Sequence, residues 1–145
     1  MNDRRFLVVC CGNTCRSPMA GEIIRHVAER AGQKVEVRTA GLWPQEHSPL
    51  ATNAVTAMRE IGLDISDDYP KGLTPALIEW ADVIVPVEEH YGDEIVDRFQ
   101  EASEKVRTLT SSIPDPYCKD LRTYRECRDL LLQAARRLVE EPHPG

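Results

Sequence analysis

The chain has 145 residues, of which 41% are apolar and 29% charged, and its net charge is −6. This composition is typical of one globular domain, expected to span residues 1–145, that needs neither a disulfide nor a metal to fold. The acidic balance argues against a nucleic-acid-binding protein, which usually carries a basic patch. The apolar run 6–11 is too short for a signal peptide or a membrane span, so the sequence predicts a cytoplasmic protein with no membrane partner.

The first part of the chain alternates strand and helix signals. Residues 6–10 are continuously apolar and rich in β-branched side chains, which predicts a buried strand. Ser17 as N-cap and Pro18 at the first helical position predict a helix that ends at Gly32. Residues 35–40 alternate between polar and apolar side chains and predict a second strand.

The middle of the chain continues this alternation. Helices are expected over 48–61 and 74–81, each beginning at a hydroxyl residue followed by proline. Residues 83–87 predict a strand, 88–99 a helix and 106–109 a fourth strand.

The last third is expected to contain a Ser- and Pro-rich loop at 111–120, a long helix at 122–140 and a frayed tail at 141–145. Strands that alternate with helices predict an α/β fold with three layers, α/β/α, around a four-stranded parallel sheet. Ligands bind beyond the carboxyl ends of the strands in such sheets. We therefore expect the functional site where the first strand ends, at Cys10.

Residues 10–17, Cys-Cys-Gly-Asn-Thr-Cys-Arg-Ser, join this strand to the first helix. A loop of this length can curl so that its N–H groups converge on one anion, and the helix N-terminus adds a positive dipole end. The guanidinium of Arg16 can contact two oxygens of a phosphate. The sequence thus predicts a loop that binds phosphate or another oxyanion through Cys11, Gly12, Asn13, Thr14, Cys15 and Ser17.

Cys10 is the candidate nucleophile of this loop. A thiol that faces a helix N-terminus and an arginine favours its thiolate form, which is the form that attacks phosphorus. The alternative is that Cys10, Cys11 and Cys15 are small buried apolar residues. An odd total of five cysteines is not typical of a disulfide framework, and the spacing of these three does not fit a zinc site.

Asp115 is the candidate general acid, because a leaving group departs more easily when it is protonated as the bond breaks. It lies between Pro114 and Pro116, which restrict the backbone on both sides. Tyr117 and Trp43 are candidates for the walls of the substrate cleft. The alternative for Asp115 is an ordinary Pro-Asp-Pro turn.

Three segments resemble the motifs of the low-molecular-weight protein tyrosine phosphatases: residues 9–20, 39–41 and 115–117. The resemblance extends over about residues 6–140. It implies a four-stranded parallel sheet flanked by helices, a phosphorylated protein as substrate and no cofactor. It also implies that Cys10 forms a cysteinyl-phosphate intermediate, that Arg16 binds the phosphate, and that Asp115 acts first as acid and then as base.

Thr14 bears on the choice of substrate. Tyrosine phosphatases of this family usually carry a bulky aliphatic residue at this place, whereas the bacterial protein arginine phosphatases carry threonine. We therefore favour phosphoarginine over phosphotyrosine, which stays open as the alternative. An arsenate reductase is a more distant alternative, because it needs two further cysteines and the segment 88–98 contains none.

Overall fold

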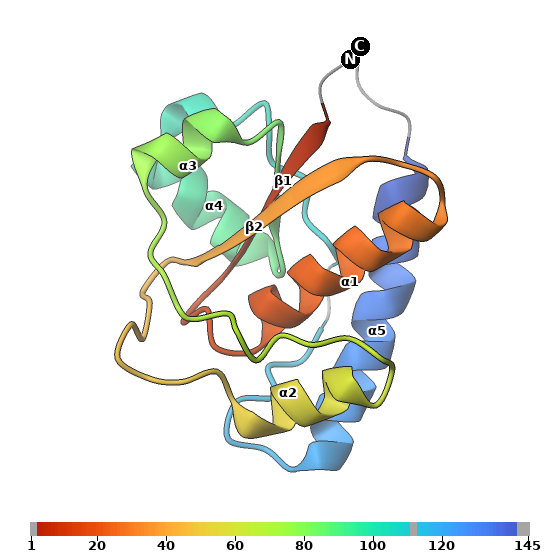
Figure 1. Ribbon diagram of the computed structural model, residues 1–145. Helices are drawn as coiled ribbons and strands as arrows, with labels where there is room; N and C mark the ends of the chain where they lie inside the picture. The colour runs from red at the N-terminus through yellow and green to blue at the C-terminus, as the bar shows by residue number, and fades with distance from the viewer. Residues whose placement is uncertain (1–2, 111–112, 142–145) are drawn as a thin grey trace.

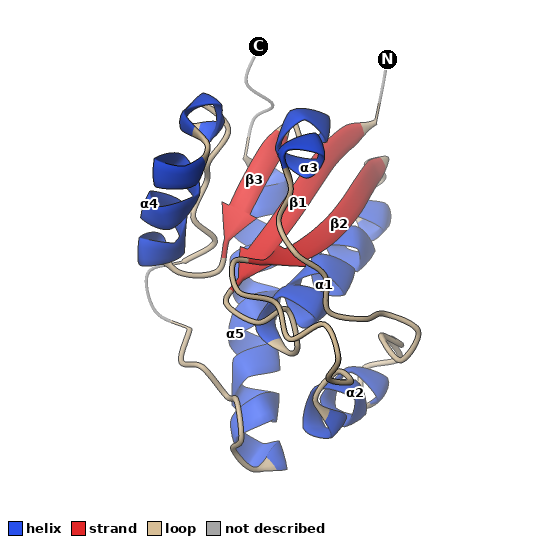
Figure 2. Ribbon diagram, turned by 90° about the vertical axis from the view of Figure 1, so that its left-hand side faces the viewer, coloured by secondary structure: helices blue, strands red, loops and turns tan. Residues whose placement is uncertain are grey.

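The computed structural model describes residues 3–110 and 113–141, and it has three layers. Figures 1 and 2 show a sheet with α3 and α4 on one face and α1 and α5 on the other. The sheet consists of parallel strands in the order β2-β1-β3. Its strands are β1 (Arg4–Cys10), β2 (Val35–Gly41) and β3 (Val83–Pro86).

The helices follow the predicted alternation. They are α1 (Arg16–Arg30), α2 (Thr52–Arg59), α3 (Pro75–Trp80), α4 (Glu89–Arg98) and α5 (Leu121–Glu140), with a short 3₁₀ helix, η1, at Gln100–Ala102. Helix α2 packs against α5. None of the helices formed by residues 3–110 and 113–141 has the length and apolar character that crossing a bilayer requires.

The expectation of a four-stranded sheet is wrong, because residues 3–110 and 113–141 form a sheet of three strands. Residues 106–109 lie beside β3, where Val106 forms an isolated parallel bridge with Ile84. Further along, the N–H of Leu109 donates to the carbonyl of Pro86 at 2.9 Å. Proline has no N–H to return the next hydrogen bond of the ladder, so regular pairing ends at Pro86.

Two helices begin at other residues than expected. Helix α1 begins at Arg16, and Ser17 is not its N-cap, because the Ser17 hydroxyl is engaged with the preceding loop. Helix α2 begins at Thr52 instead of at residues 48–49. The N–H of Ala51 donates to the carbonyl of Thr14 at 3.0 Å, which holds the preceding residues in a loop against the segment after β1.

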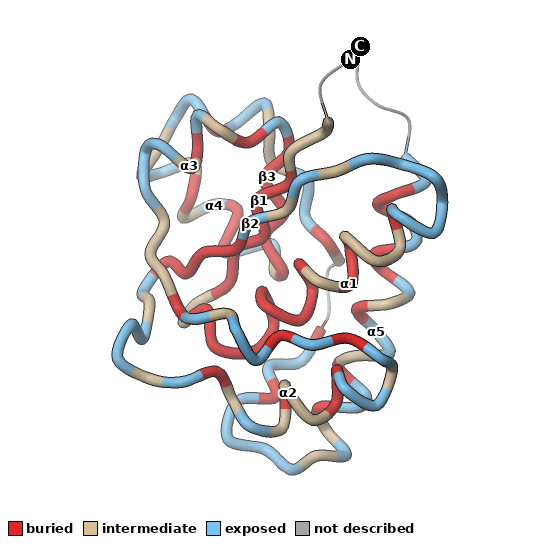
Figure 3. Tube along the Cα trace, in the orientation of Figure 1, coloured by how far each residue is buried: buried red, intermediate tan, exposed pale blue. Residues whose placement is uncertain are grey.

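The core lies along the central strand. Phe6–Cys10 of β1 are all buried, as predicted, and Figure 3 shows burial concentrated on the sheet and on the inner sides of α1 and α5. The connection from β1 to α1 therefore starts at the carboxyl end of the most buried strand. Ser111 and Ser112 of the predicted loop, and residues 142–145 of the predicted tail, lie outside the described residues.

Candidate active site

The connection between β1 and α1, residues 11–15, is tightly folded. Asn13 has φ 57°, in the left-handed region that asparagine tolerates better than most residues. The backbone of Gly41 on β2 lies directly against this connection. A Cβ atom on Gly41 would lie 2.7 Å from the carbonyl oxygen of Cys11, so only glycine allows this close approach.

A cavity of about 90 Å³ opens over this connection. The structure brings together here the three residues predicted as catalytic, Cys10, Arg16 and Asp115. They come from the end of β1, the start of α1 and the loop before α5. The remaining lining residues are Cys11, Gly12, Thr14, Cys15, Gln45 and Tyr117.

Three predicted substrate-binding residues do not line this cavity. Asn13 and Ser17 are fully buried behind the connection, because their side chains turn towards β2 and Cys10. Trp43 is 54% exposed outside the cavity, and the guanidinium of Arg98 lies 4.8 Å from its ring centroid. These side chains therefore do not form the walls of this cavity, and their contact with substrate stays a prediction.

The Cys10 sulfur has two close polar neighbours. The Ser17 Oγ lies 2.9 Å from Sγ, and the backbone N–H of Asn13 donates to Sγ at 3.3 Å. Burial raises the pKa of the Cys10 thiol, while these hydrogen bonds and the charge of Arg16 act to lower it. The net pKa is raised, opposite to our expectation, because the burial of the thiol outweighs the effects of its hydrogen bonds and of Arg16.

Arg16 is held by several partners although its side chain is only 2% exposed. Its Nη1 donates to Glu88 Oε1 at 2.5 Å and to the carbonyl of Ile113 at 2.9 Å. Its Nη2 donates to the hydroxyl of Tyr91 at 2.9 Å and lies 3.7 Å from Asp115 Oδ2. Burial lowers the pKa of Arg16, but the contact with Glu88 and the charge of Asp115 raise it above its ordinary value, so the guanidinium stays charged.

Asp115 lies at the mouth of the cavity, and its side chain is 51% exposed. Its Oδ1 accepts a hydrogen bond from the N–H of Tyr117 at 3.1 Å, which holds the carboxyl group against its own loop. The Tyr117 hydroxyl donates to Gln45 Oε1 at 3.4 Å across the opening. The carboxyl group is thus open to solvent on one side and faces Arg16 on the other.

Behind the connection, the Asn13 side chain is the centre of a hydrogen-bond network. Its Nδ2 donates to Ser17 Oγ at 2.6 Å and to Thr39 Oγ1 at 3.1 Å, and its Oδ1 accepts from the backbone N–H of Lys71 at 2.9 Å. Ser17 lies on α1, Thr39 on β2 and Lys71 in the segment between α2 and α3, so the Asn13 side chain joins three separate parts of the fold. The Asn13 side chain therefore supports the loop instead of lining the cavity.

Sequence reasoning missed several residues of the site: Gln45, Lys71, Glu88 and Tyr91. One signal was available for Glu88, which follows β3 at the same sheet edge as Cys10, where the carboxyl ends of parallel strands meet. Within the described part of the chain, no group of three or more His, Cys, Asp or Glu residues is arranged to hold a metal ion.

Comparison with known proteins identifies the family. Residues 5–143 match the family described as "Low molecular weight phosphotyrosine protein phosphatase". A relative from Geobacillus stearothermophilus named "Protein-arginine-phosphatase" is 33% identical, with 94% of this chain and 95% of the relative covered. A relative from Ralstonia nicotianae named "Probable low molecular weight protein-tyrosine-phosphatase EpsP" is also 33% identical, over 88% of each chain.

A solved structure shows the same fold. The low molecular weight protein tyrosine phosphatase from T. tengcongensis superposes with a TM-score of 0.90 at 30% sequence identity, covering 95% of this chain and 99% of the other. The matched family covers almost the whole chain, including the motifs at residues 9–20 and 115–117. The chain therefore belongs to the low molecular weight phosphotyrosine protein phosphatase family, whose members are hydrolases acting on phosphorylated residues.

Proposed function

We propose that this protein removes phosphate from phosphorylated side chains of proteins through a cysteinyl-phosphate intermediate, and that it favours phosphoarginine over phosphotyrosine. The observation that carries the proposal is the cavity at the end of β1, where a thiol, a guanidinium and a carboxyl group meet. These are the groups that a nucleophile, an anion-binding residue and a general acid require.

The phosphoryl group is bound by the connection 11–15 and by Arg16. The N-terminus of α1 points into this region, and its positive dipole end favours an anion. Among the described residues, the Nε of Arg16 has no hydrogen-bond partner, whereas both terminal nitrogens are engaged. This N–H is the donor that Arg16 retains for an oxygen of the phosphoryl group.

The reaction proceeds in two displacements. The Cys10 thiolate attacks phosphorus as the bond to the leaving nitrogen or oxygen breaks, and Asp115 protonates the leaving group. Water then attacks the cysteinyl phosphate, Asp115 accepts a proton from that water, and the sulfur–phosphorus bond breaks. Phosphate leaves, and the Cys10 thiolate is restored. Charge on the equatorial oxygens is stabilised by Arg16 and the loop N–H groups.

The walls of the cavity support phosphoarginine as substrate. Thr14, Gln45 and Asp115 each present an oxygen that can accept a hydrogen bond from the N–H groups of a phosphoguanidinium. A phosphotyrosine ring brings no such donors and prefers an apolar wall. The relatives named "Protein-arginine-phosphatase" from Geobacillus stearothermophilus and Bacillus subtilis lend support from the sequence side.

Phosphotyrosine is the second candidate. Tyr117, an aromatic side chain at the opening of the cavity and 45% exposed, can pack against the ring of a phosphotyrosine. The relative named as a probable tyrosine phosphatase has the same identity to this chain, 33%, as the arginine phosphatase from Geobacillus stearothermophilus, over 88% of this chain instead of 94%. The residues that hold the phosphoryl group serve both substrates equally.

Phosphate release from one phosphoarginine peptide and one phosphotyrosine peptide, compared side by side with Cys10→Ser as blank, tests the proposal. We expect faster release from phosphoarginine. Thr14→Ile removes a hydroxyl and adds apolar area, and should shift the ratio of kcat/KM towards phosphotyrosine by less than about tenfold. Faster release from phosphotyrosine by the parent protein, or an unchanged ratio in Thr14→Ile, would contradict the assigned preference.

A further inference from the structure

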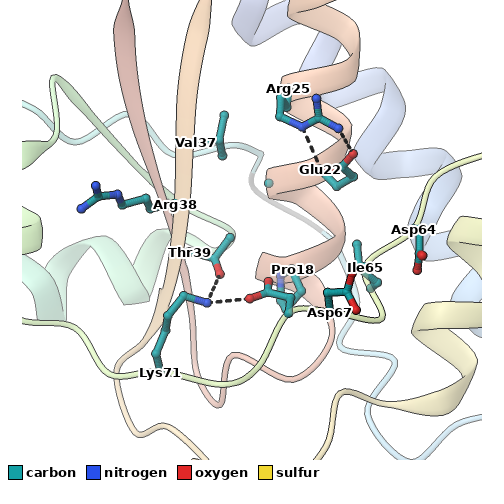
Figure 4. Close-up of a pocket in the computed structure, with 12 residues that line it drawn as sticks. Pro18, Glu22, Arg25, Val37, Arg38, Thr39, Asp64, Ile65, Asp67 and Lys71 are labelled. Atoms are coloured by element: carbon teal, nitrogen blue, oxygen red, sulfur yellow. Dashed lines mark hydrogen bonds and ion pairs between the residues drawn. The ribbon is translucent and has the colours of Figure 1, made fainter.

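A second cavity, of about 270 Å³, shares no lining residue with the cavity over the connection 11–15. Figure 4 shows it between α1, β2 and the segment that carries Asp64 and Lys71. Its lining is strongly charged, and it includes Thr39, whose hydroxyl belongs to the network behind the loop. The cavity therefore reaches the rear of the proposed active site without opening into it.

Lys71 joins this cavity to the network. Its Nζ is within hydrogen-bond distance of Thr39 Oγ1 at 3.3 Å, Asp68 Oδ1 at 2.8 Å and the carbonyl of Tyr69 at 3.0 Å. An ammonium group has three hydrogens to donate, so these three acceptors use all of them. The backbone N–H of Lys71 also donates to Asn13 Oδ1 at 2.9 Å. One residue thus contacts the network at two places.

The backbone N–H of Lys71 sets the direction of the Asn13 hydrogen bonds, while its ammonium group holds the Thr39 oxygen that accepts one of them. A backbone N–H can only donate, so the atom of Asn13 that faces Lys71 is the oxygen, and Nδ2 must face Thr39 and Ser17. The Ser17 hydroxyl therefore accepts from Asn13. Its single hydrogen remains for the Cys10 sulfur, 2.9 Å away, and a donor at that position stabilises the thiolate.

Burial keeps this arrangement rigid. Asn13 and Ser17 are fully buried and Thr39 is only 6% exposed, whereas the Lys71 side chain is 31% exposed towards the cavity. Helix α1 packs closely on Thr39, because a Cβ atom on Gly21 would lie 2.7 Å from the Thr39 Cγ2 atom. The Thr39 side chain is therefore confined between Gly21 and Lys71, and its oxygen has a defined position.

We propose that Lys71 is a positioning residue for Cys10: through Thr39 and Asn13 it holds the Ser17 hydroxyl as a donor to the nucleophilic sulfur. The proposal rests on the proposed function in that it takes Cys10 as the nucleophile. Lys71 lies on the far side of the loop from the substrate and has no contact with the first cavity. Its role is therefore in the reactivity of the thiol and not in substrate binding.

The hydrogen bonds that lead from Lys71 to Cys10 have different charged groups at their two ends. On the Lys71 side, Asp68 pairs with the ammonium group, and the other charged lining residues are Glu22, Arg25, Arg38, Asp64 and Asp67. On the Cys10 side, the other titratable or charged residues that line the cavity are Cys11, Cys15, Arg16, Asp115 and Tyr117. Since the ammonium charge is already paired, Lys71 acts on Cys10 through directed hydrogen bonds more than through its field.

The test is the pH profile of Cys10 alkylation by iodoacetamide, followed on the Cys10 peptide by mass spectrometry, in the parent and in Lys71→Met. We expect alkylation below the pKa of Cys10 to slow by about threefold to tenfold, which corresponds to the loss of one hydrogen bond. The kcat for a small aryl phosphate should fall by a similar factor, while KM stays within about twofold. Lys71→Arg restores a donor and should recover most of the rate.

Lys105→Met is the matched control. The Lys105 ammonium group also donates to backbone carbonyls, those of Ile78 at 2.8 Å and Glu79 at 3.3 Å, but it lies away from the network. Its loss should lower stability and leave the Cys10 profile unchanged. Thr39→Val completes a double-mutant cycle, in which adding Lys71→Met to Thr39→Val should slow alkylation little further, because both substitutions break the same path.

The outcomes separate the two proposals. An unchanged Cys10 profile in Lys71→Met, an equal change in Lys105→Met, or fully additive effects in the cycle would overturn the role of Lys71 while phosphatase activity stands. A parent protein that releases phosphate from neither peptide would overturn the proposed function. In that case the alkylation profile, which needs no substrate, still decides whether Lys71 positions the thiol.

Discussion

The ion pair between Arg16 and Glu88 allows a quantitative prediction. The Arg16 side chain is 2% exposed and the Glu88 side chain 23% exposed, so the pair is largely removed from water. Removing one partner of a buried ion pair costs about 3–5 kcal/mol, because the other charge is left without compensation. Glu88→Gln keeps an acceptor at the same place but removes the negative charge.

Several contacts of Arg16 survive this substitution. The carbonyl of Ile113 and the hydroxyl of Tyr91, both 2.9 Å away, still accept from the guanidinium, and Asp115 remains nearby. Burial raises the pKa of Tyr91 to about 12, so its hydroxyl stays neutral and adds no charge to replace that of Glu88. We therefore expect Glu88→Gln to lower the free energy of unfolding by about 1–2 kcal/mol.

The assay is thermal unfolding with and without saturating inorganic phosphate. Without phosphate, a loss of this size should lower the thermal midpoint by about 3–6 °C in a domain of this length. With phosphate, the difference from the parent should shrink, because the bound anion supplies a new negative partner for Arg16. The largest effect is thus expected in the protein without phosphate.

Glu60→Gln is the control for this experiment. Glu60 pairs with Arg125 and Arg128 between α2 and α5, at 2.6 and 2.9 Å, but on the surface of the protein. Glu60→Gln should lower the free energy of unfolding less than Glu88→Gln does, since water screens exposed ion pairs. Phosphate should not change the effect of Glu60→Gln. A Glu88→Gln variant that is as stable as Glu60→Gln, with no response to phosphate, would refute the reasoning.

Two further predictions concern the general acid and the buried thiols. Asp115→Asn should lower kcat on the phosphorylated peptide by about 10²–10⁴-fold and on an aryl phosphate with a good leaving group by much less; equal losses would argue against an acid. Burial raises the pKa of Cys15 and of Cys127 to about 12 each, so iodoacetamide at about pH 8 should label them only after unfolding, as peptide mass spectrometry would show. Because the folded protein holds these protons more tightly, the free energy of unfolding should fall as pH rises from about 9 to about 12, and a flat urea midpoint over this range would contradict the assignment.

Local signals in the sequence were enough to predict most elements of the fold. Thr74 was predicted to start a helix, and its hydroxyl accepts from the N–H of Leu77 at 3.2 Å at the start of α3. The apolar run at 6–10 became the buried central strand. Caps and apolar runs act within a few residues, so they can be recognised without knowing the rest of the structure.

The features that were predicted wrongly or missed have a common cause, because each depends on residues far away in the sequence. The fourth strand depended on whether β3 could complete a ladder, and the proline at its end prevents this. Ser17 looks like an N-cap by type and position, but its hydroxyl is taken by Cys10 and Asn13. The same holds for Glu88 and Lys71, whose contacts with Arg16 and Asn13 join residues 72 and 58 positions apart.

The residues that support Cys10 and Arg16 differ from the residues that line the cavity for the substrate. Glu88 holds Arg16 and Lys71 holds the Asn13 network, yet neither lines the cavity that would receive the substrate. Thr14 and Gln45 do line it. We therefore expect substitutions at these wall positions to change the preferred phosphorylated residue while the contacts of Arg16 and Asn13 stay in place. The relatives named for phosphoarginine and for phosphotyrosine are each 33% identical to this chain, over 94% and 88% of it, so overall identity alone does not separate the two substrates.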